Sequence, residues 1–180
     1  MRLFIAINFP KEVKAAIAEI RDILKESALR GNFTFDENLH LTLVFLGECD
    51  LRQAEVIKAV IKNTKFPELT LILEKAGYFK RDGGNTWWVG LKENKALSDL
   101  QADLTERLRQ EGFMLESRRF APHVTIGREV KIPAGFVLPA IQQLSFKISS
   151  IELMKSERIN GRLVYTQMYS LCSIQVDNSL

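Results

Sequence analysis

One tetrapeptide pattern occurs twice in this chain of 180 residues and contains both of its histidines. His40-Leu41-Thr42-Leu43 and His123-Val124-Thr125-Ile126 share the order histidine, apolar, threonine, apolar, and they lie nearly half a chain apart. Alternate side chains of a β-strand face opposite sides, so each histidine would share a face with its threonine while the apolar residues face a core. The repeat therefore predicts two related lobes, each with one such strand.

The remaining elements should mix helices with hairpins. The expected strands cover residues 3–7, 33–35, 40–46, 69–79, 87–91, 123–128, 144–154 and 163–171. One expected helix covers residues 10–27, a second follows a capping box at Asp50 and Gln53, and a third runs from an Asn94 cap to Gly112. This order predicts an α+β fold rather than a doubly wound parallel sheet.

The two histidines suit acid–base chemistry. Imidazole titrates near neutral pH, so one ring can be charged while the other is neutral. Placed across a substrate, His40 and His123 would supply a general acid and a general base. Thr42 and Thr125 would donate hydrogen bonds to the non-bridging oxygens of a phosphate. The sequence contains no zinc-binding spacing and no obvious metal cluster, so we expect neither a metal nor another cofactor.

Composition excludes several other classes of protein. Apolar residues make up 46% of the chain and charged residues 26%, as in ordinary globular proteins, and the net charge of +3 permits an anionic substrate without requiring one. No apolar run approaches the ~18 residues of a membrane helix, and the run 3–7 is too short for a signal peptide. Cys49 and Cys172 are too isolated for a disulfide framework. We expect a cytoplasmic monomer that does not contact membranes.

Longer segments around the two tetrapeptides carry a resemblance to a known family. These are residues 37–47 and 119–128, supported by residues 2–7, 153–156, 161–162 and Tyr165. The first two resemble the paired signatures of the 2H phosphoesterase superfamily, and the whole is most similar to its RNA 2′,3′-cyclic phosphodiesterase (2′-5′ RNA ligase-like) family. Because the resemblance covers almost the whole chain, residues 1–180 are expected to form a single bilobal domain.

The resemblance implies both a fold and a reaction. The fold would have two pseudo-symmetric lobes, with antiparallel sheets facing a central cleft and helices outside. The reaction would be metal-independent hydrolysis of a terminal 2′,3′-cyclic phosphate, on RNA or a nucleotide, to a 2′-phosphate. In that scheme His123 is the proton acceptor for the attacking water, and His40 is the proton donor to the departing 3′-oxygen. Thr42 and Thr125 hold the phosphate oxygens.

Three further residues are expected to bind the substrate. Arg128 stands where the family has an arginine, although strict alternation from His123 points it away from the cleft unless Gly127 allows a bulge. Tyr165 and Phe9 are candidates for stacking on a base. Two alternative functions stay open: an RNA ligase that forms 2′-5′ bonds from 2′,3′-cyclic phosphate and 5′-hydroxyl ends, and a nucleotide- or RNA-binding module without turnover.

Overall fold

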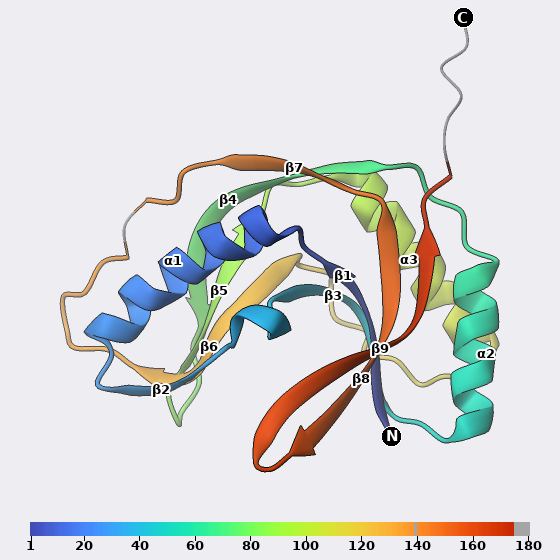
Figure 1. The fold of residues 1–180 in the computed structure, drawn as a ribbon, viewed down its shortest axis with the longest axis horizontal. Coiled ribbons are helices and arrows are strands. Elements are labelled where there is room, and N and C mark those ends of the chain that lie inside the picture. Colours follow the sequence, from blue (N-terminus) through green and yellow to red (C-terminus); the bar gives the residue numbers. More distant parts are fainter. Residues whose placement is uncertain (139, 175–180) are drawn as a thin grey trace, which may run out of the picture.

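The computed structural model describes residues 1–138 and 140–174, and these contain three α-helices, one short 3-10 helix and nine strands (Figure 1). In chain order the elements are β1 (Arg2–Asn8), α1 (Lys11–Ser27), β2 (Arg30–Phe33), η1 (Asp36–Asn38), β3 (His40–Glu48), α2 (Leu51–Lys62), β4 (Leu69–Phe79), β5 (Asn85–Leu91), α3 (Lys95–Gln110), β6 (His123–Lys131), β7 (Leu144–Ile148), β8 (Ser150–Ile159) and β9 (Arg162–Cys172). The predicted α+β class is confirmed.

The strands form two antiparallel sheets whose orders correspond. One sheet runs β3-β1-β8-β9 and the other β2-β6-β5-β4-β7. Each motif strand is hydrogen-bonded to an antiparallel neighbour, β3 to β1 and β6 to β5. Counted from the motif strands, β3-β1-β8-β9 matches β6-β5-β4-β7, and β2 is an additional strand on the free side of β6. The prediction of two pseudo-symmetric lobes with antiparallel sheets is therefore confirmed.

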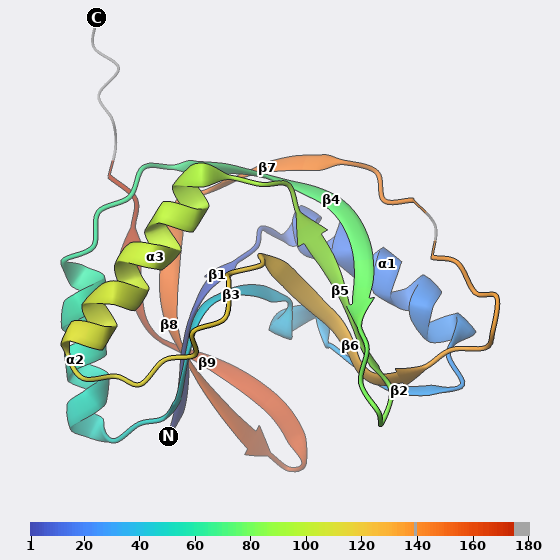
Figure 2. The same cartoon turned by 180° about the vertical axis from the view of Figure 1, so that it is seen from behind.

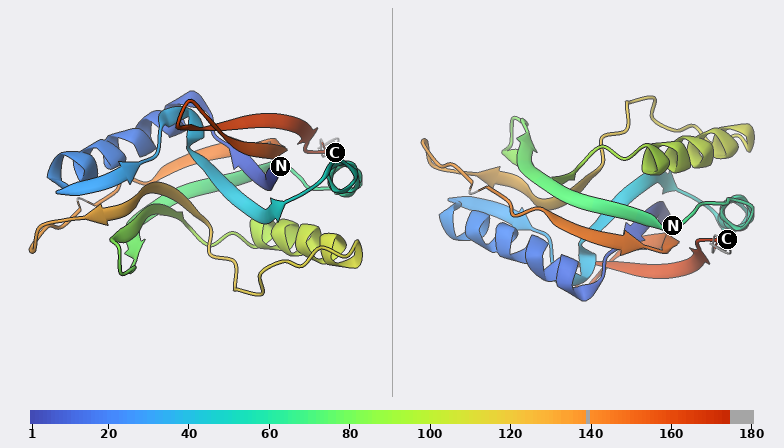
Figure 3. Two further views of the ribbon diagram at one scale, coloured as in Figure 1. Left: turned by 90° about the horizontal axis from the view of Figure 1, so that it is seen from below. Right: turned by 90° about the horizontal axis from the view of Figure 1, so that it is seen from above.

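The helices lie outside the sheets, as predicted, and the two long ones are exchanged between the lobes. α1 follows β1 of the four-stranded sheet but contacts β2 and β6 of the other sheet. α3 follows β5 of the five-stranded sheet but contacts β3. Figure 2 shows α2 beside α3, and Figure 3 shows α1 and α3 on opposite sides of the molecule. This exchange joins the lobes, and the main buried cluster contains residues from both sheets.

Local signals explain where the helices begin and end. The side chain of Asp50 accepts a hydrogen bond from the backbone N–H of Gln53, and the side chain of Gln53 accepts one from the backbone N–H of Asp50, which is the predicted capping box. The Asn94 side chain likewise accepts a hydrogen bond from the Leu97 N–H. Gly112, with φ of 86°, follows the end of α3. No helix in the described part of the chain is long and apolar enough to span a bilayer.

The predicted strand 144–154 is wrong in one respect, because the structure divides it between the two sheets. β7 pairs with β4 in the five-stranded sheet, whereas β8 pairs with β1 and β9 in the four-stranded sheet. The chain crosses from one sheet to the other at Ser149. Both halves contribute buried apolar side chains, Phe146 from the first and Leu153 from the second, so apolar patterning alone gives no sign of the crossing.

Two strand boundaries also differ from the prediction. The short strand expected at 33–35 lies at Arg30–Phe33. The Thr34 N–H still donates a hydrogen bond of 3.0 Å to the Ile126 carbonyl oxygen of β6, and η1 begins two residues later at Asp36. The motif strand β3 does not end at Gly47 but continues to Glu48. Gly47 has φ of 75° and is accommodated inside the strand next to a register shift with β1.

The indole of Trp88 packs across two glycines of the five-stranded sheet. A Cβ atom at Gly77 would come within 2.7 Å of the indole ring, and one at Gly90 within 2.9 Å. Both positions therefore need glycine for the close approach of the ring. The centroid of the same ring lies 6.4 Å from that of His123. The two glycines thus help to set the packing around one of the two motif histidines.

This packing makes a stability prediction with a matched control. Gly77→Ala should lower the free energy of unfolding by roughly 1–3 kcal/mol, because the added methyl group displaces a packed indole. Gly83→Ala adds the same methyl group where no heavy atom lies within 4 Å, and its effect should stay within about 0.5 kcal/mol. Urea unfolding followed by tryptophan fluorescence measures both. Equal stability of the two variants would contradict the packing argument.

Candidate active site

The two motif strands bring their polar faces to one cleft between the sheets. β3 and β6 contact each other, and His40, Thr42, His123 and Thr125 all line the cleft, which has a volume of about 1120 Å³. The intervening apolar residues of both tetrapeptides are buried on the opposite face of their strands. The alternation expected from the sequence is therefore present in both lobes, and the four polar side chains are brought together.

The two imidazoles are held in the same way. The Nδ1 of His40 lies 2.7 Å from the carbonyl oxygen of Asn38, and the Nδ1 of His123 lies 2.7 Å from the carbonyl oxygen of Ala121. A carbonyl oxygen only accepts hydrogen bonds, so each Nδ1 must carry the proton and donate it. In a neutral ring this leaves Nε2 as the basic nitrogen. The Nε2 of His40 is 3.0 Å from the Thr42 hydroxyl oxygen, and the hydroxyl donates to it when the ring is neutral.

The surroundings of the two rings differ. His40 is enclosed by Phe4, at 4.9 Å between ring centroids, and by Tyr165, at 5.1 Å in an edge-to-face arrangement. Burial is the main reason that the pKa of His40 is lowered from 6.5 to about 4, and the positive charges of Lys14 and Arg128 act in the same direction. The hydrogen bond to the Asn38 carbonyl opposes this shift but does not cancel it. His40 is therefore neutral in the substrate-free protein at neutral pH.

The ring of His123 packs against a different pair of aromatic side chains. Phe79 approaches it edge-to-face at 5.2 Å between centroids, and Trp88 lies at 6.4 Å. The strand behind it is fixed from the other side, since the Thr34 hydroxyl donates a hydrogen bond of 2.9 Å to the carbonyl oxygen of Thr125. The added strand β2 and the residue that follows it thus support the second motif.

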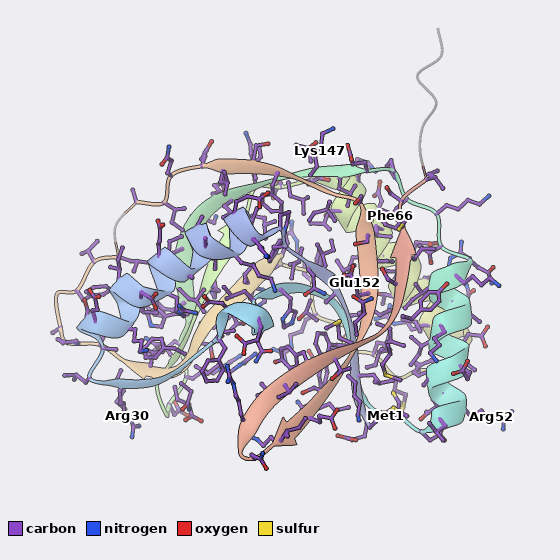
Figure 4. All side chains as sticks on the ribbon, viewed as in Figure 1. Met1, Arg30, Arg52, Phe66, Lys147 and Glu152 are labelled. Carbon is purple, nitrogen blue, oxygen red and sulfur yellow. The ribbon has the colours of Figure 1, made fainter. Side chains whose placement is uncertain are left out.

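A buried carboxylate supports the strand beside the first motif. Glu152, which Figure 4 labels in the middle of the molecule, is only 4% exposed. It accepts hydrogen bonds from the Asn8 backbone N–H at 3.2 Å and from the Ser150 hydroxyl at 2.6 Å. Burial raises the pKa of this carboxyl group. Since Asn8 pairs with His40 across β1 and β3, this network fixes the backbone opposite the motif histidine.

A β-bulge turns Arg128 into the cleft. Trp88 pairs with Thr125 and Trp87 with Gly127, so Ile126 is an additional residue in β6. The bulge shifts the alternation by one position, which buries both Ile126 and Gly127 and turns Arg128 to the same face as His123 and Thr125. The sequence suggested a bulge at Gly127, and in the structure the additional residue is Ile126, one position earlier. The charge of Arg128 also lowers the pKa values of His40 and Tyr165, although burial raises that of Tyr165 overall.

The two aromatic candidates have different positions. Tyr165 lines the cleft, with its ring against those of His40 and Phe4. Phe9 does not line the cleft: it is 7% exposed and packs edge-to-face against Phe146 in the core. The expectation that Phe9 contacts substrate is therefore corrected. Phe9 was a candidate only as an aromatic side chain that could stack on a base, and its ring belongs to the buried core instead.

Sequence reasoning missed several residues of the cleft. Phe45 and Phe35 are each 46% exposed and line the cleft, with a guanidinium group over each ring. The guanidinium groups belong to Arg2, 4.9 Å from the Phe45 centroid, and Arg162, 4.1 Å from the Phe35 centroid. Phe45 lies five residues after His40, as Arg128 lies five residues after His123. This equal spacing in the sequence could have indicated that Phe45 lines the cleft as Arg128 does.

The cleft carries more positive than negative charge. Its lining residues include five cationic side chains and one carboxylate, Glu129, which accepts a hydrogen bond from the Asn32 side chain. Within residues 1–138 and 140–174, no three histidine, cysteine, aspartate or glutamate side chains are grouped as a metal site would require. The chemistry available from the described side chains is thus proton transfer by two imidazoles beside hydroxyl and guanidinium donors.

Comparisons with known proteins agree with this geometry. Residues 9–160 match the 2′-5′ RNA ligase superfamily. The RNA 2′,3′-cyclic phosphodiesterase of Thermotoga maritima is 36% identical over 131 residues, which cover 71% of this chain and 70% of that protein. The enzyme of the same name from Escherichia coli is 29% identical over 168 residues, covering 93% of each chain. Among solved structures, E. coli LigT complexed with 3′-AMP has a TM-score of 0.86 at 28% identity, covering 97% of this chain and 98% of LigT.

The lowered pKa of His40 predicts a pH dependence of stability. The unfolded chain binds a proton at this position near pH 6.5, whereas the folded protein binds it only near pH 4. The stability contributed by neutral His40 is therefore complete above about pH 6.5 and is lost as the pH falls towards 4. Relative to His40→Asn, the wild-type free energy of unfolding should fall by about 3 kcal/mol over this range.

Urea unfolding of both proteins at several pH values measures this difference. Glu152, whose raised pKa acts with the opposite sign, is present in both proteins and cancels in the comparison. A pH dependence that is the same in wild type and in His40→Asn would refute the assignment.

Proposed function

The chain belongs to the 2′-5′ RNA ligase superfamily, and we propose that it hydrolyses the terminal 2′,3′-cyclic phosphate of RNA to a 2′-phosphate. The observation that supports this best is the pair of matching sites. Two histidine–threonine pairs, one from each sheet, line a single positively charged cleft, and both rings carry their proton on Nδ1. Relatives at up to 36% identity are named RNA 2′,3′-cyclic phosphodiesterases.

In the proposed reaction a water molecule attacks phosphorus in line with the 3′-oxygen. The Nε2 of His123 accepts a proton from the water as the new O–P bond forms. His40 donates a proton to the 3′-oxygen as the P–O3′ bond breaks, so the product has a 2′-phosphate and a 3′-hydroxyl. Arg128 and the two threonines contact the non-bridging oxygens, where negative charge increases during the displacement.

The low pKa of His40 is compatible with the donor role. A proton donor with a lowered pKa is a stronger acid, and this favours proton transfer to the departing 3′-oxygen, which is strongly basic as an alkoxide. The negative charge of the bound phosphodiester raises the pKa of a neighbouring imidazole, so His40 acquires its proton together with the substrate. The positive charges of Arg128 and Lys14, which oppose protonation in the free protein, are offset by that same phosphate.

Protonation of His40 would also release the Thr42 hydroxyl. In the neutral state the hydroxyl donates to the Nε2 of His40 at 3.0 Å. Once Nε2 carries a proton it can no longer accept that hydrogen bond, and the hydroxyl proton becomes available to a phosphate oxygen. Protonated His40 can donate a proton to the leaving oxygen, and the same protonation frees the Thr42 hydroxyl to bind phosphate.

RNA is the partner that this proposal assigns, and the cytoplasm is the proposed location. Cys49 and Cys172 are both unpaired, as is usual for thiols in a reducing compartment. The same two histidines would catalyse ligation if a ribose 5′-hydroxyl attacked phosphorus in place of water while the P–O3′ bond breaks. The hydrolase and ligase alternatives therefore differ in the attacking hydroxyl group and not in the catalytic residues.

The histidine assignment predicts a large loss of activity. His40→Ala and His123→Ala should each lower kcat on a short RNA ending in a 2′,3′-cyclic phosphate by roughly 10²–10⁴-fold, because each removes a general acid or base. Thr42→Val should also lower kcat. Thr70→Val makes the same substitution on β4 at an exposed position that does not line the cleft, and it should leave kcat unchanged. Full activity in either histidine variant would exclude this mechanism.

The identity of the product tests the direction of the reaction. With His40 as donor to the 3′-oxygen, the only monoester formed should be the 2′-phosphate, and EDTA should have no effect on the rate. Mass spectrometry cannot separate the two monoesters, so ³¹P NMR or digestion with a phosphatase specific for 3′-phosphates is the measurement. A 3′-phosphate product would contradict the proton roles proposed here, and a 2′-5′-linked product in the presence of 5′-hydroxyl RNA would support ligation.

A further inference from the structure

Each motif histidine is oriented by a backbone carbonyl, so its orientation depends on what fixes that carbonyl. In the first lobe the carbonyl belongs to Asn38 and in the second to Ala121, and each oxygen lies 2.7 Å from the Nδ1 of its histidine. A carbonyl can hold a ring in one orientation only if its own peptide group is held in place. The two lobes hold this peptide group by different means.

In the second lobe a proline restrains the chain. Pro122 stands between Ala121 and His123, and the ring of a proline fixes φ at about −65°. The residue before a proline is restricted as well, to extended conformations. The Pro122 carbonyl also accepts a hydrogen bond of 3.4 Å from the Leu91 backbone N–H. Restraints on the backbone itself therefore orient the Ala121 carbonyl.

In the first lobe the position of this proline is occupied by Leu39, and the side chain of Asn38 restrains the peptide instead. The Asn38 Nδ2 lies 2.9 Å from the carbonyl oxygen of Leu163 in β9. Because a carbonyl only accepts hydrogen bonds, Nδ2 is the donor. The Asn38 backbone N–H donates to the Phe35 carbonyl, also at 2.9 Å. A single residue thus connects η1, strand β9 and the imidazole of His40.

The bond from Asn38 to β9 restrains η1 more strongly than the other side-chain contacts of this turn. Asn38 is only 5% exposed, and a buried amide without a partner loses considerable free energy. The side-chain contacts of its neighbours Asp36 and Glu37 lie on the exposed surface, where ion pairs contribute little. The position of the carbonyl that holds His40 therefore depends mainly on the Asn38 amide.

The same bond joins the two edges of the four-stranded sheet. β3, which η1 precedes, and β9 are the outer strands in the order β3-β1-β8-β9. The pairing of β8 with β1 ends at Ser156, and beyond that point β8 and β9 pair only with each other (Figure 1). Leu163 belongs to this extension, and Tyr165, two residues later, lies against the His40 ring at 5.1 Å between centroids. Asn38 therefore holds the hairpin extension against the start of the motif strand.

We propose that Asn38 is a positioning residue for the reaction: its side-chain amide holds η1 against β9 and thereby keeps the Asn38 carbonyl where it orients the His40 ring. The effect on catalysis rests on the proposed function, whereas the orientation of the ring is observable in the free protein. Without the amide the carbonyl can turn away, and the Nδ1–H of the neutral ring loses its acceptor. The ring then exchanges between its two tautomers, and Nε2 no longer faces the substrate as a base in every molecule.

Nuclear magnetic resonance reads the two imidazoles separately. The chain has two histidines, so protein labelled with ¹⁵N in the histidine rings gives two pairs of nitrogen signals, and His40→Asn identifies the pair that belongs to His40. At neutral pH without substrate, the His40 signals of the wild type should be those of the Nδ1–H tautomer. In Asn38→Ala and Asn38→Leu, which differ in volume but both lack the donor, they should move to the values of a tautomer mixture. The His123 signals should not change.

The same two variants should lower kcat on a short RNA ending in a 2′,3′-cyclic phosphate by up to roughly 10²-fold, as expected for a displaced catalytic group, with little change in KM. Thr64→Val is the matched control. Thr64 is 3% exposed, its hydroxyl donates a hydrogen bond of 3.0 Å to the Val60 carbonyl, and it does not line the cleft. This variant also loses a buried hydrogen bond to the backbone, but it should leave kcat and both pairs of nitrogen signals unchanged.

Unchanged His40 signals in both Asn38 variants, or an unchanged kcat, would overturn the positioning role. Equal changes in the His123 signals would overturn it too, because they would show a general loosening of the fold. A wild-type protein without activity on the RNA would instead overturn the proposed function, and the nitrogen signals would still decide whether Asn38 orients the ring.

Discussion

The site depends on one hydrogen bond that is made twice: the Nδ1–H of each motif histidine donates to the backbone carbonyl two residues earlier in the chain. This bond uses no other side chain, so it is available wherever a histidine begins a strand and the preceding backbone turns back towards it. It fixes both the tautomer and the rotation of the ring. A general acid or base needs both to be fixed, because proton transfer requires a nitrogen within hydrogen-bond reach of the reacting oxygen.

The β-bulge after each threonine adds a second constraint to this arrangement. Strict alternation would give each motif strand a cleft-facing row at the histidine, the threonine and the residue two positions further on, where Val44 and Gly127 stand. The bulge moves this third position to Phe45 and Arg128. The same backbone irregularity in both sheets thus supports an aromatic group in one lobe and a cation in the other. The backbone is thus pseudo-symmetric, whereas the side chains at the two corresponding positions differ in their chemistry.

Much of this could be predicted from the sequence, and the failures have physical reasons. The faces of His40, Thr42, His123 and Thr125 follow from a period of two, and the helix ends follow from local capping. The division of residues 144–154 at Ser149 depends on which strands are free to pair, and that is a property of the whole fold. Phe45 escaped prediction because the pairing partner, not the strand itself, decides where a bulge forms. The burial of Phe9 depends likewise on Phe146, which is far away in the sequence.

The two histidines have unequal environments, and we propose that this difference gives the symmetric pair its direction. Phe4 and Tyr165 enclose His40, and that enclosure keeps the ring neutral until an anion arrives. Binding of the phosphodiester would then be coupled to uptake of a proton by His40 and to release of the Thr42 hydroxyl from its hydrogen bond to the ring. In this scheme the cleft does not store a proton in the free protein, and the substrate itself brings about the charged state that its cleavage needs.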